Sequence, residues 1–384
     1  MKNYMKRAIA LLLVLAMQCA LFGWSWATTQ ASADAPLTEA PEIPGLTFVE
    51  KTDLTYAQCF SLFRYEGGYT LISVQDDGEF LVVPEDGQVP DGLDDSIVVL
   101  QQPMNRMYLA ATSAMALFAA IDAVDCIRLT GTRASGWYVD AAVEALESGS
   151  MLFSGKYSEP DYELMIGEDC DLAIESTMIH HTPKVREMIQ DLGIPVMIDC
   201  SSYEPHPLGR TEWIRLYAAI VGKEAEAEAF MEKQSALANF EDTGKTIAFF
   251  YINTDGSVVI RKPTDYIPKM LSLAGGHYVY EHLADDEKAS SVSSVTMEDF
   301  YNTAVDADML IYNAAIVAPI SSIDELIAKD SLFADFKAVK EGNVWCTGKS
   351  YFQATDTVGE MIRDIHAALT GGDESQMTFL YRVS

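Results

Sequence analysis

The chain has 384 residues, of which 57 are acidic and 26 are basic, and its formal net charge is −31 at pH 7. A field of this sign repels phosphate backbones, which disfavours nucleic acid as a partner and favours solubility, basic docking surfaces or cationic ligands. The length is too great for one small hydrophobic core and predicts two domains of ordinary size.

Residues 1–33 predict a secretory signal peptide. A basic start at 1–7 precedes an apolar run at 8–24, and the small residues Ala31-Ser32-Ala33 follow a polar break. This pattern is what signal peptidase requires, so we expect cleavage after Ala33, with Ala27 as the second choice. An uncleaved anchor is the alternative, because an apolar run of this length can just span a bilayer core. We therefore expect an exported protein, in the periplasm or at the extracellular face of the cytoplasmic membrane.

The cysteines leave two questions open. Cys19 raises lipidation, but Ala16-Met17-Gln18 does not look like a bacterial lipobox, so tethering to the membrane stays undecided. The other cysteines are widely separated, with no CxxC pair and no zinc-type spacing: Cys59, Cys126, Cys170, Cys200 and Cys346. Such a set favours buried small hydrophobes and leaves room for one disulfide, whose pairing the sequence does not assign.

The segments after the signal peptide predict a linker and a small β structure. Residues 34–45 are rich in proline and acid and predict a linker. In the following stretch, Asp76-Asp77-Gly78 separates the β-type runs 69–74 and 80–84, which is a strong hairpin signal. We expect a small N-terminal β-hairpin decoration on the first lobe, residues 46–207.

The remainder of the first lobe alternates short apolar runs with helical patterns. Residues 96–100 are typical of a buried parallel strand, and a helical pattern follows over 108–122. Strand, helix and strand recur at 171–174, 183–192 and 193–199. This succession predicts a parallel α/β layer.

A long helical pattern then separates two α/β regions. It runs from Arg210 to about Asn239, is interrupted at Gly222, and predicts a bridging helix over 208–240, with a kink or a boundary at the glycine. The second lobe, residues 241–384, repeats the α/β rhythm, with strands at 245–251, 309–312 and 343–345 and helices at 267–274 and 323–329. The predicted fold class is α/β: two Rossmann-like lobes joined by one long rigid helix.

This outline resembles the substrate-binding proteins of ABC importers for iron-siderophores, haem and cobalamin. Local motifs carry the resemblance from about Ser96 to the end, and they agree with the family patterns in order and spacing. They are Glu159-Pro160-Asp161-Tyr162-Glu163-Leu164, Asp169-Cys170-Asp171-Leu172-Ala173-Ile174, Ala274-Gly275-Gly276-His277, Val295-Thr296-Met297-Glu298-Asp299 and Ala307-Asp308-Met309-Leu310-Ile311. Cys170 and Ala307 depart from the family's usual proline, and neither change disturbs a strand.

The resemblance implies two docking residues, Glu163 and Glu298, one on each lobe, that pair with arginines of a membrane permease. Carboxylates suit this task, because the planar guanidinium of arginine binds them bidentately.

The resemblance also implies a ligand cleft between the lobes, lined by loops at the carboxyl ends of the strands. Candidates in such loops have aromatic, basic or metal-ligating side chains: Arg133, Trp137, Tyr138, Tyr157, His180, His181, Tyr203, Glu204, His206, Arg210, Arg261, Lys262, Tyr266, Tyr351 and Phe352. Aromatic faces suit a macrocycle or a catecholate, and basic side chains offset the charge of a ferric chelate or of haem propionates. Whether a histidine or a tyrosine ligates a metal stays open, and Glu204 and His206 are equally consistent with hinge-side structure.

The expected function is therefore capture of an iron complex, either siderophore or haem, or of a corrinoid, and its delivery to an ABC permease by a monomer without a cofactor of its own. The alternative is a zinc- or manganese-type receptor of the same outline, for which the second lobe offers only His277, His282 and His366. A cell-surface interaction module is a further alternative. We expect no enzyme, because no nucleophile elbow, phosphate loop or paired cysteine motif is present.

Overall fold

The computed structural model describes residues 35–238, 240–283 and 292–384. The predicted signal peptide and Cys19 lie outside these ranges. Within them, no helix has the length and apolar character needed to cross a membrane.

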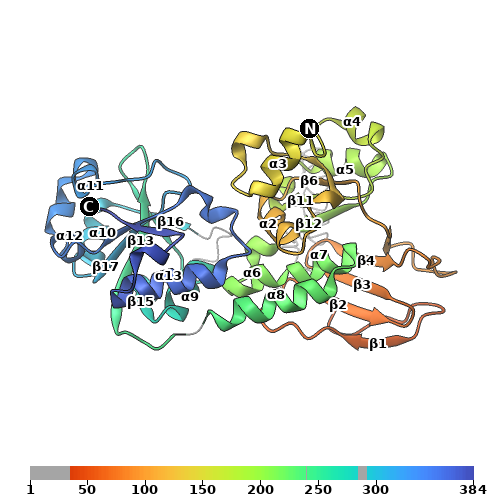
Figure 1. The fold of residues 1–384 in the computed structure, drawn as a ribbon, viewed down its shortest axis with the longest axis horizontal. Coiled ribbons are helices and arrows are strands. Elements are labelled where there is room, and N and C mark those ends of the chain that lie inside the picture. The colour runs from red at the N-terminus through yellow and green to blue at the C-terminus, as the bar shows by residue number, and fades with distance from the viewer. Residues whose placement is uncertain (1–34, 239, 284–291) are drawn as a thin grey trace, which may run out of the picture. The chain divides into compact units, whose positions relative to one another are not determined.

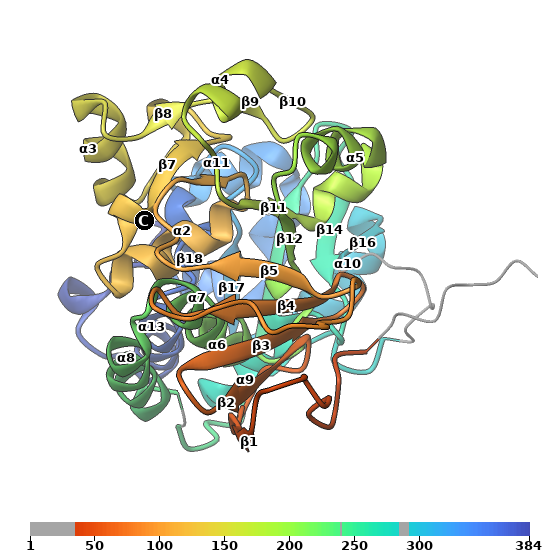
Figure 2. The ribbon, with the colours of Figure 1, turned by 90° about the vertical axis from the view of Figure 1, so that its right-hand side faces the viewer.

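The first described part of the chain forms a five-stranded sheet, which we call the front sheet. Its strands lie side by side in the order β1-β2-β3-β4-β5 (Figure 2). Its strands are β1 (Phe48–Lys51), β2 (Phe60–Tyr65), β3 (Tyr69–Val74), β4 (Gly78–Val83) and β5 (Val98–Gln101). The predicted hairpin is β3–β4, and β5 pairs with β4 in parallel. Residues 96–100, expected in the parallel layer of the lobe, therefore complete the front sheet instead, because an apolar run does not specify which sheet it joins.

Both faces of the front sheet are buried along β2, β3 and β4, whereas the edge strand β1 is exposed. Leu62 and Ile72 point into the core of the first lobe, and Phe63 and Leu71 belong to a second cluster on the opposite face. Residues 35–45, expected as a linker, lie against that second face, where the Tyr65 hydroxyl donates to the Pro41 carbonyl at 2.7 Å. The front sheet is thus a structural layer rather than a small decoration.

The first lobe has a parallel sheet in the order β12-β11-β6-β7-β8. Its strands are β6 (Met107–Leu109), β7 (Ile127–Thr130), β8 (Leu152–Phe153), β11 (Ala173–Ser176) and β12 (Val196–Asp199). Its helices are α2 (Thr112–Ala120), α3 (Asp140–Ser148), α4 (Tyr162–Gly167) and α5 (Pro183–Asp191). The predicted succession β11, α5, β12 is confirmed, whereas Tyr108, expected in a helix, lies in β6 and the helix begins only at Thr112.

The segment expected as one bridging helix is divided into three. It consists of α6 (Pro207–Glu212), α7 (Ile214–Val221) and α8 (Glu224–Ala236), which run between the lobes in green in Figure 1. Gly222 ends α7 with a left-handed φ of 72°, a conformation that glycine adopts without strain. Helix α7 packs on α2 of the first lobe, whereas α8 packs on α7 and on α13 (Val358–Thr370) of the second.

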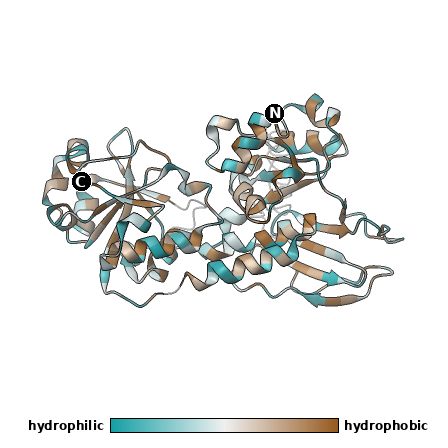
Figure 3. Ribbon diagram, in the orientation of Figure 1, coloured by the Kyte–Doolittle hydropathy of each residue, from teal (hydrophilic) through white to brown (hydrophobic). Residues whose placement is uncertain are grey.

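The second lobe has a seven-stranded mixed sheet in the order β16-β14-β13-β17-β18-β19, with β15 also paired to β13. Its strands are β13 (Lys245–Ile252), β14 (Val258–Arg261), β15 (Gly276–Tyr278), β16 (Val292–Val295), β17 (Met309–Tyr312), β18 (Val344–Thr347) and β19 (Leu380–Arg382). Its other helices are α9 (Tyr266–Leu273), α10 (Met297–Ala304), α11 (Ile323–Lys329) and α12 (Lys337–Lys340). Hydrophobic residues follow the strands of both lobes, whereas α8 carries hydrophilic residues along much of its length (Figure 3).

Buried carboxylates attach the front sheet to the crossing segment. Glu212 of α6 accepts three successive backbone N–H groups, those of Thr55, Tyr56 and Ala57, at 3.0, 2.7 and 2.7 Å. Glu204 accepts the next two, from Gln58 and Cys59, at 2.8 and 2.9 Å. Hydrogen bonds to an ionised acceptor are stronger than neutral ones, so these two residues fix the segment that connects β1 to β2.

Replacing Glu212 by alanine should lower the free energy of unfolding by at least about 2 kcal/mol, because it leaves three backbone donors without their acceptor. The measurement is equilibrium unfolding in urea, with Glu232→Ala as the matched control. Glu232 is exposed on α8 and makes no hydrogen bond or ion pair in the described part of the chain. Equal stabilities of the two variants would contradict the anchoring role.

Candidate functional site

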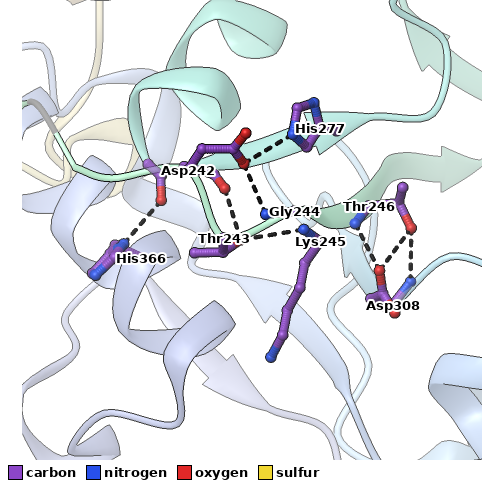
Figure 4. A network of polar contacts seen from close by, with 10 residues as sticks. Asp242, Thr243, Gly244, Lys245, Thr246, His277, Asp308 and His366 are labelled. Carbon is purple, nitrogen blue, oxygen red and sulfur yellow. Dashed lines mark hydrogen bonds and ion pairs between the residues drawn. The ribbon is translucent and has the colours of Figure 1, made fainter.

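The two lobes repeat one tie between neighbouring strands. In the first, an Asp171 carboxylate oxygen accepts the backbone N–H groups of Asn105 and Arg106, both at 2.9 Å, just before β6. In the second, an Asp308 oxygen accepts from the Thr246 backbone at 2.8 Å and hydroxyl at 3.0 Å (Figure 4). Both aspartates lie within two residues of the start of a central strand, β11 or β17. The Asp of the matching motifs thus has a physical reason in each lobe: it fixes the amino end of the adjacent strand.

The predicted docking glutamates occupy equivalent places in the two lobes. Helix α4 begins after Asp161, whose carboxylate accepts the Leu164 N–H at 3.0 Å, and α10 begins after Thr296, whose hydroxyl accepts the Asp299 N–H at 3.1 Å. Glu163 and Glu298 are each the second residue of the helix that follows, and both are exposed. In each lobe, the helix that carries the glutamate is followed in the chain by the aspartate and its strand, Asp171 and β11 or Asp308 and β17.

Exposed apolar side chains gather at one edge of each sheet. They lie in the loops that follow the carboxyl ends of parallel strands β7, β11, β12, β17 and β18, which we call the edge loops. Their side chains are between 41 and 67% exposed: Tyr138, Met178, Tyr203, Ile316 and Phe352. Open α/β sheets bind ligands at this edge. The sequence predicted the three aromatic residues and missed Met178 and Ile316, because a single aliphatic residue in a loop has no distinguishing pattern.

The loops after β7 and β18 meet across the lobes. The Gln353 side chain accepts the Tyr138 backbone N–H and donates to the Gly136 carbonyl, both at 2.8 Å. The rings of Tyr138 and Phe352 meet edge to face at 6.1 Å. The structure thus brings together two predicted aromatic residues from different lobes.

A groove of about 290 Å³ adjoins this contact. Tyr138 and Asp140 line it from the first lobe, and Gln353, Asp356 and Thr357 from the second. Burial raises the pKa of Asp356 to about 6, and Glu360 contributes in the same direction. The groove is therefore acidic on both sides.

A second group of predicted residues surrounds a buried cation. The guanidinium of Arg210 lies 4.2 Å from the ring centroid of Tyr266. Next to Tyr266 in sequence, Asp265 pairs with Arg261 at 3.4 Å. Burial raises the pKa of Tyr351 well above its ordinary value, and Tyr266 is the next largest cause. Lys262 is also buried. Arg210, Arg261, Lys262, Tyr266 and Tyr351 therefore belong to one region between α6 and the second lobe.

Three other predicted residues contact side chains or backbone groups of the protein itself. Trp137 is buried in the core of the first lobe and donates to the Thr132 carbonyl at 3.1 Å. Glu204 follows Tyr203 in the loop after β12, but its buried carboxylate binds two backbone N–H groups and the indole N–H of Trp213 at 2.9 Å. Arg133 stacks on Phe153 at 4.0 Å.

The predicted histidines and Tyr157 do not converge. His180 and His181 are exposed in a short helix after β11, and Tyr157 lies in the turn between β9 (Gly155–Lys156) and β10 (Glu159–Pro160). His206 caps α6 by accepting the Leu208 N–H at 3.2 Å, and burial, followed by Lys269, lowers its pKa to about 4. Among the described residues, no three His, Cys, Asp or Glu side chains are grouped so that they could hold a metal ion.

The histidines of the second lobe lie at the opposite end of its sheet. His277 in β15 contacts Asp242 at 2.9 Å, and β15 pairs with the amino end of β13 (Figure 4). His366 contacts the Ala274 carbonyl at 3.0 Å and stacks on Phe240. Both are therefore remote from the carboxyl ends of β13 and β17.

A buried acid that the sequence did not single out lies in β11. Glu175 has no exposed area, and neither carboxyl oxygen has a hydrogen-bond partner in the described part of the chain. Burial raises its pKa to about 8. It is therefore largely protonated at neutral pH.

Comparison with known proteins adds to this geometry. No family model matches the chain. The chain is 25% identical over 296 residues to the uncharacterized lipoprotein MJ0878 of Methanocaldococcus jannaschii, covering 72% of this chain and 68% of the relative. It is 24% identical over 348 residues to the uncharacterized lipoprotein MJ0872 of the same organism, covering 85% and 86%.

Three solved structures illustrate the fold. The periplasmic haem-binding protein HutB of Vibrio cholerae has a TM-score of 0.55 at 15% identity, covering 67% of this chain and 97% of HutB. The petrobactin-binding protein YclQ of Bacillus subtilis has 0.54 at 15%, covering 69% and 92%. The molybdate-binding protein MolA of Haemophilus influenzae has 0.52 at 14%, covering 70% and 86%. The chain therefore has the fold of periplasmic binding proteins.

Replacing Glu175 by glutamine should flatten the pH dependence of stability. Because the pKa is raised from 4.5 to about 8 on folding, the folded chain retains a proton that the unfolded chain releases, and wild-type stability falls as pH rises through this window. The stability of the variant relative to wild type should grow by about 3 kcal/mol between about pH 5 and about pH 7.5.

The measurement is urea unfolding of both proteins across this range, with Glu147→Gln as the control. Glu147 is exposed on α3. Parallel pH profiles for wild type and Glu175→Gln would show that the buried carboxyl does not titrate as described.

Proposed function

We propose that the chain is an exported solute-binding protein that captures a metal complex and delivers it to an ABC permease. The observation that carries the proposal is the repetition of one arrangement in both lobes. In each, an exposed glutamate at a helix start, Glu163 or Glu298, precedes a strand that is tied to its neighbour by Asp171 or Asp308. Two exposed glutamates in equivalent places, one on each lobe, suit a permease that presents basic side chains to both lobes.

The transported solute is proposed to be a ferric siderophore, haem or a corrinoid. Aromatic side chains at the edge loops, Tyr138, Tyr203 and Phe352, offer flat apolar faces. The basic residues Arg210 and Arg261 are supplied by α6 and β14. Haem, petrobactin and molybdate are named as ligands of proteins that share the fold. These ligands support an iron complex or another metal-containing solute as the class.

The signal-peptide pattern of residues 1–33 supports export, and two curated relatives are named lipoproteins. The protein then acts as a monomer at the outer face of the cytoplasmic membrane or in the periplasm, with or without a tether. No catalytic step belongs to this proposal.

A bare metal-ion receptor is the weaker candidate. It needs three or four imidazole and carboxylate ligands that converge from both lobes. His277 and His366 lie at the amino end of β13, and His282 is exposed beside Glu281. Among the described residues, no histidine is grouped with two further His, Cys, Asp or Glu side chains that could hold a metal ion.

The binding step is tested with the purified mature chain. Haemin, cobalamin and several ferric siderophores are titrated while tryptophan fluorescence and visible absorbance are recorded. Saturable binding of one of them with a micromolar or lower Kd is expected. If none binds, capture of these complexes is excluded.

The docking step is tested by replacing Glu163 and Glu298 together with alanine. The double variant should bind the solute with unchanged affinity and lose uptake, because neither glutamate is among the residues proposed to line the cleft, whereas both are proposed to meet the permease. Uptake of labelled solute into cells is compared with that supported by Glu147→Ala combined with Glu341→Ala, which removes one exposed glutamate from each lobe outside the two motifs. Undiminished uptake by the Glu163, Glu298 variant would overturn the assignment.

A further inference from the structure

Gln353 joins the two lobes through both ends of its side-chain amide. It lies between β18 and α13 of the second lobe and is only 1% exposed. Its Oε1 atom accepts the Tyr138 N–H and its Nε2 atom donates to the Gly136 carbonyl, both at 2.8 Å. A buried amide is costly unless its polar atoms are paired, and here the pairing depends on the opposite lobe.

The loop after β7 is complete only with this amide. The N–H groups of Gly136 and Trp137 donate to carbonyls three residues earlier in the same loop, and the Trp137 side chain is buried in the core of the first lobe. The Gly136 carbonyl and the Tyr138 N–H are paired with Gln353 instead. Since backbone groups inside a protein need partners, the second lobe supplies part of the hydrogen bonding of this first-lobe loop.

The neighbours of Gln353 make further contacts with the first lobe. We call residues 352–355 the strap. The Thr355 hydroxyl donates to the Ser113 carbonyl in α2, and the Thr355 carbonyl accepts the Thr211 hydroxyl of α6 at 2.9 Å. The side chain of Thr355 is buried, as is that of Gln353. The strap is therefore bonded to the loop after β7, to α2 and to the crossing segment.

The strap gives the lobes a second connection besides the crossing segment. A rotation of one lobe about the crossing segment would separate the loops after β7 and β18, break both bonds of Gln353 and leave its enclosed amide unpaired. The groove of about 290 Å³ beside this contact is lined by both lobes, so its shape depends on their separation. The strap thus opposes a change in that separation.

We propose that Gln353 is a positioning residue that holds the loops after β7 and β18 together in the ligand-free protein and so sets the separation of the lobes before the solute arrives. This inference rests on the proposed capture function and adds how its site is kept ready. Gln353 acts through the exposed rings of Tyr138 and Phe352, which its two bonds keep in edge-to-face contact. Loops that are already in place lose less conformational freedom on binding, which raises the affinity.

The first arm of the test needs no solute. Gln353→Met keeps the length of the side chain and removes both hydrogen bonds. The distance between spectroscopic probes attached at the exposed residues Glu147 and Glu341, one on each lobe, should have a narrow distribution in wild type and a broader one in the variant. Amide hydrogen exchange at Tyr138 should become faster by at least about tenfold.

Gln102→Met is the matched control. The Gln102 amide donates to the Ala219 and Ile220 carbonyls at 3.3 and 3.0 Å, so both of its bonds lie within one half of the molecule, at the end of α7. Its loss should lower the stability without changing the distance between the lobes. Identical distance distributions in wild type and Gln353→Met would overturn the proposal.

The second arm measures affinity for haemin, cobalamin and the ferric siderophores. Gln353→Met should weaken binding of the probe that wild type binds by at least about tenfold, because the two loops must then be ordered on binding. Gln102→Met should bind that probe as wild type does.

Gln353→Glu tests the hydrogen bonds themselves. The introduced carboxyl has nearly the same shape, but only its protonated form can donate to the Gly136 carbonyl while accepting from Tyr138. Its affinity relative to wild type should be low at about pH 8 and recover at about pH 5, because burial favours the protonated form. Asp140 and Asp356, which line the same groove, titrate in both proteins and cancel in this ratio. A ratio that stays constant with pH contradicts the positioning role.

The outcomes separate the two proposals. If wild type binds a probe and Gln353→Met binds it equally tightly, the positioning role is overturned while solute capture stands. If wild type binds no probe, capture of these complexes fails, and the distance distributions alone decide for or against Gln353.

Discussion

Carboxylates that accept backbone N–H groups hold this structure together. The chain has 57 acidic and 26 basic side chains, so a buried acid cannot generally rely on a cation. Glu204 and Glu212 bind five successive N–H groups at residues 55–59, and Asp171 and Asp308 bind N–H groups at the start of neighbouring strands. Arg215 and Lys337 add ion pairs to Glu212 and Asp308, at 3.6 and 2.6 Å. Each such bond replaces water around a charged oxygen with a fixed donor, which makes the joint directional as well as strong.

The front sheet depends on these joints most directly. Its hairpin tip uses the same device: Asp77 is fully enclosed, accepts the Ile198 N–H at 2.7 Å and pairs with Arg186 at 2.6 Å. Ile198 lies in β12, the edge strand of the first lobe, whose unpaired N–H would otherwise need water. The sheet is therefore fixed to the crossing segment at one end and to the lobe at the other, with an apolar face buried between them.

Arg210 and Glu175 differ from the other buried charged residues in their partners. Where most buried charges in the described chain have directional partners, this guanidinium has an aromatic face and no anion, and Glu175 has no partner at all. Burial resolves the two cases differently. Glu175 becomes neutral because its pKa rises to about 8, whereas arginine keeps its proton.

The sequence alone determined the α/β class, the two lobes and the β11, α5, β12 succession, because buried parallel strands leave continuous apolar runs and helices leave a 3.6-residue period. It also placed Glu163 and Glu298 in matching motifs. Tertiary structure decided what such periodicity does not record: that residues 98–101 join the front sheet, that residues 35–45 cover it, and that Gly222 is a boundary between two helices rather than a kink. It also decided which site candidates meet, because Tyr138 with Phe352 and Arg210 with Tyr266 are contacts between residues far apart in the chain. Glu204 and Arg210 look alike in the sequence as charged residues near one hinge, and only the donors and acceptors around each distinguish an anchor from an unpaired charge.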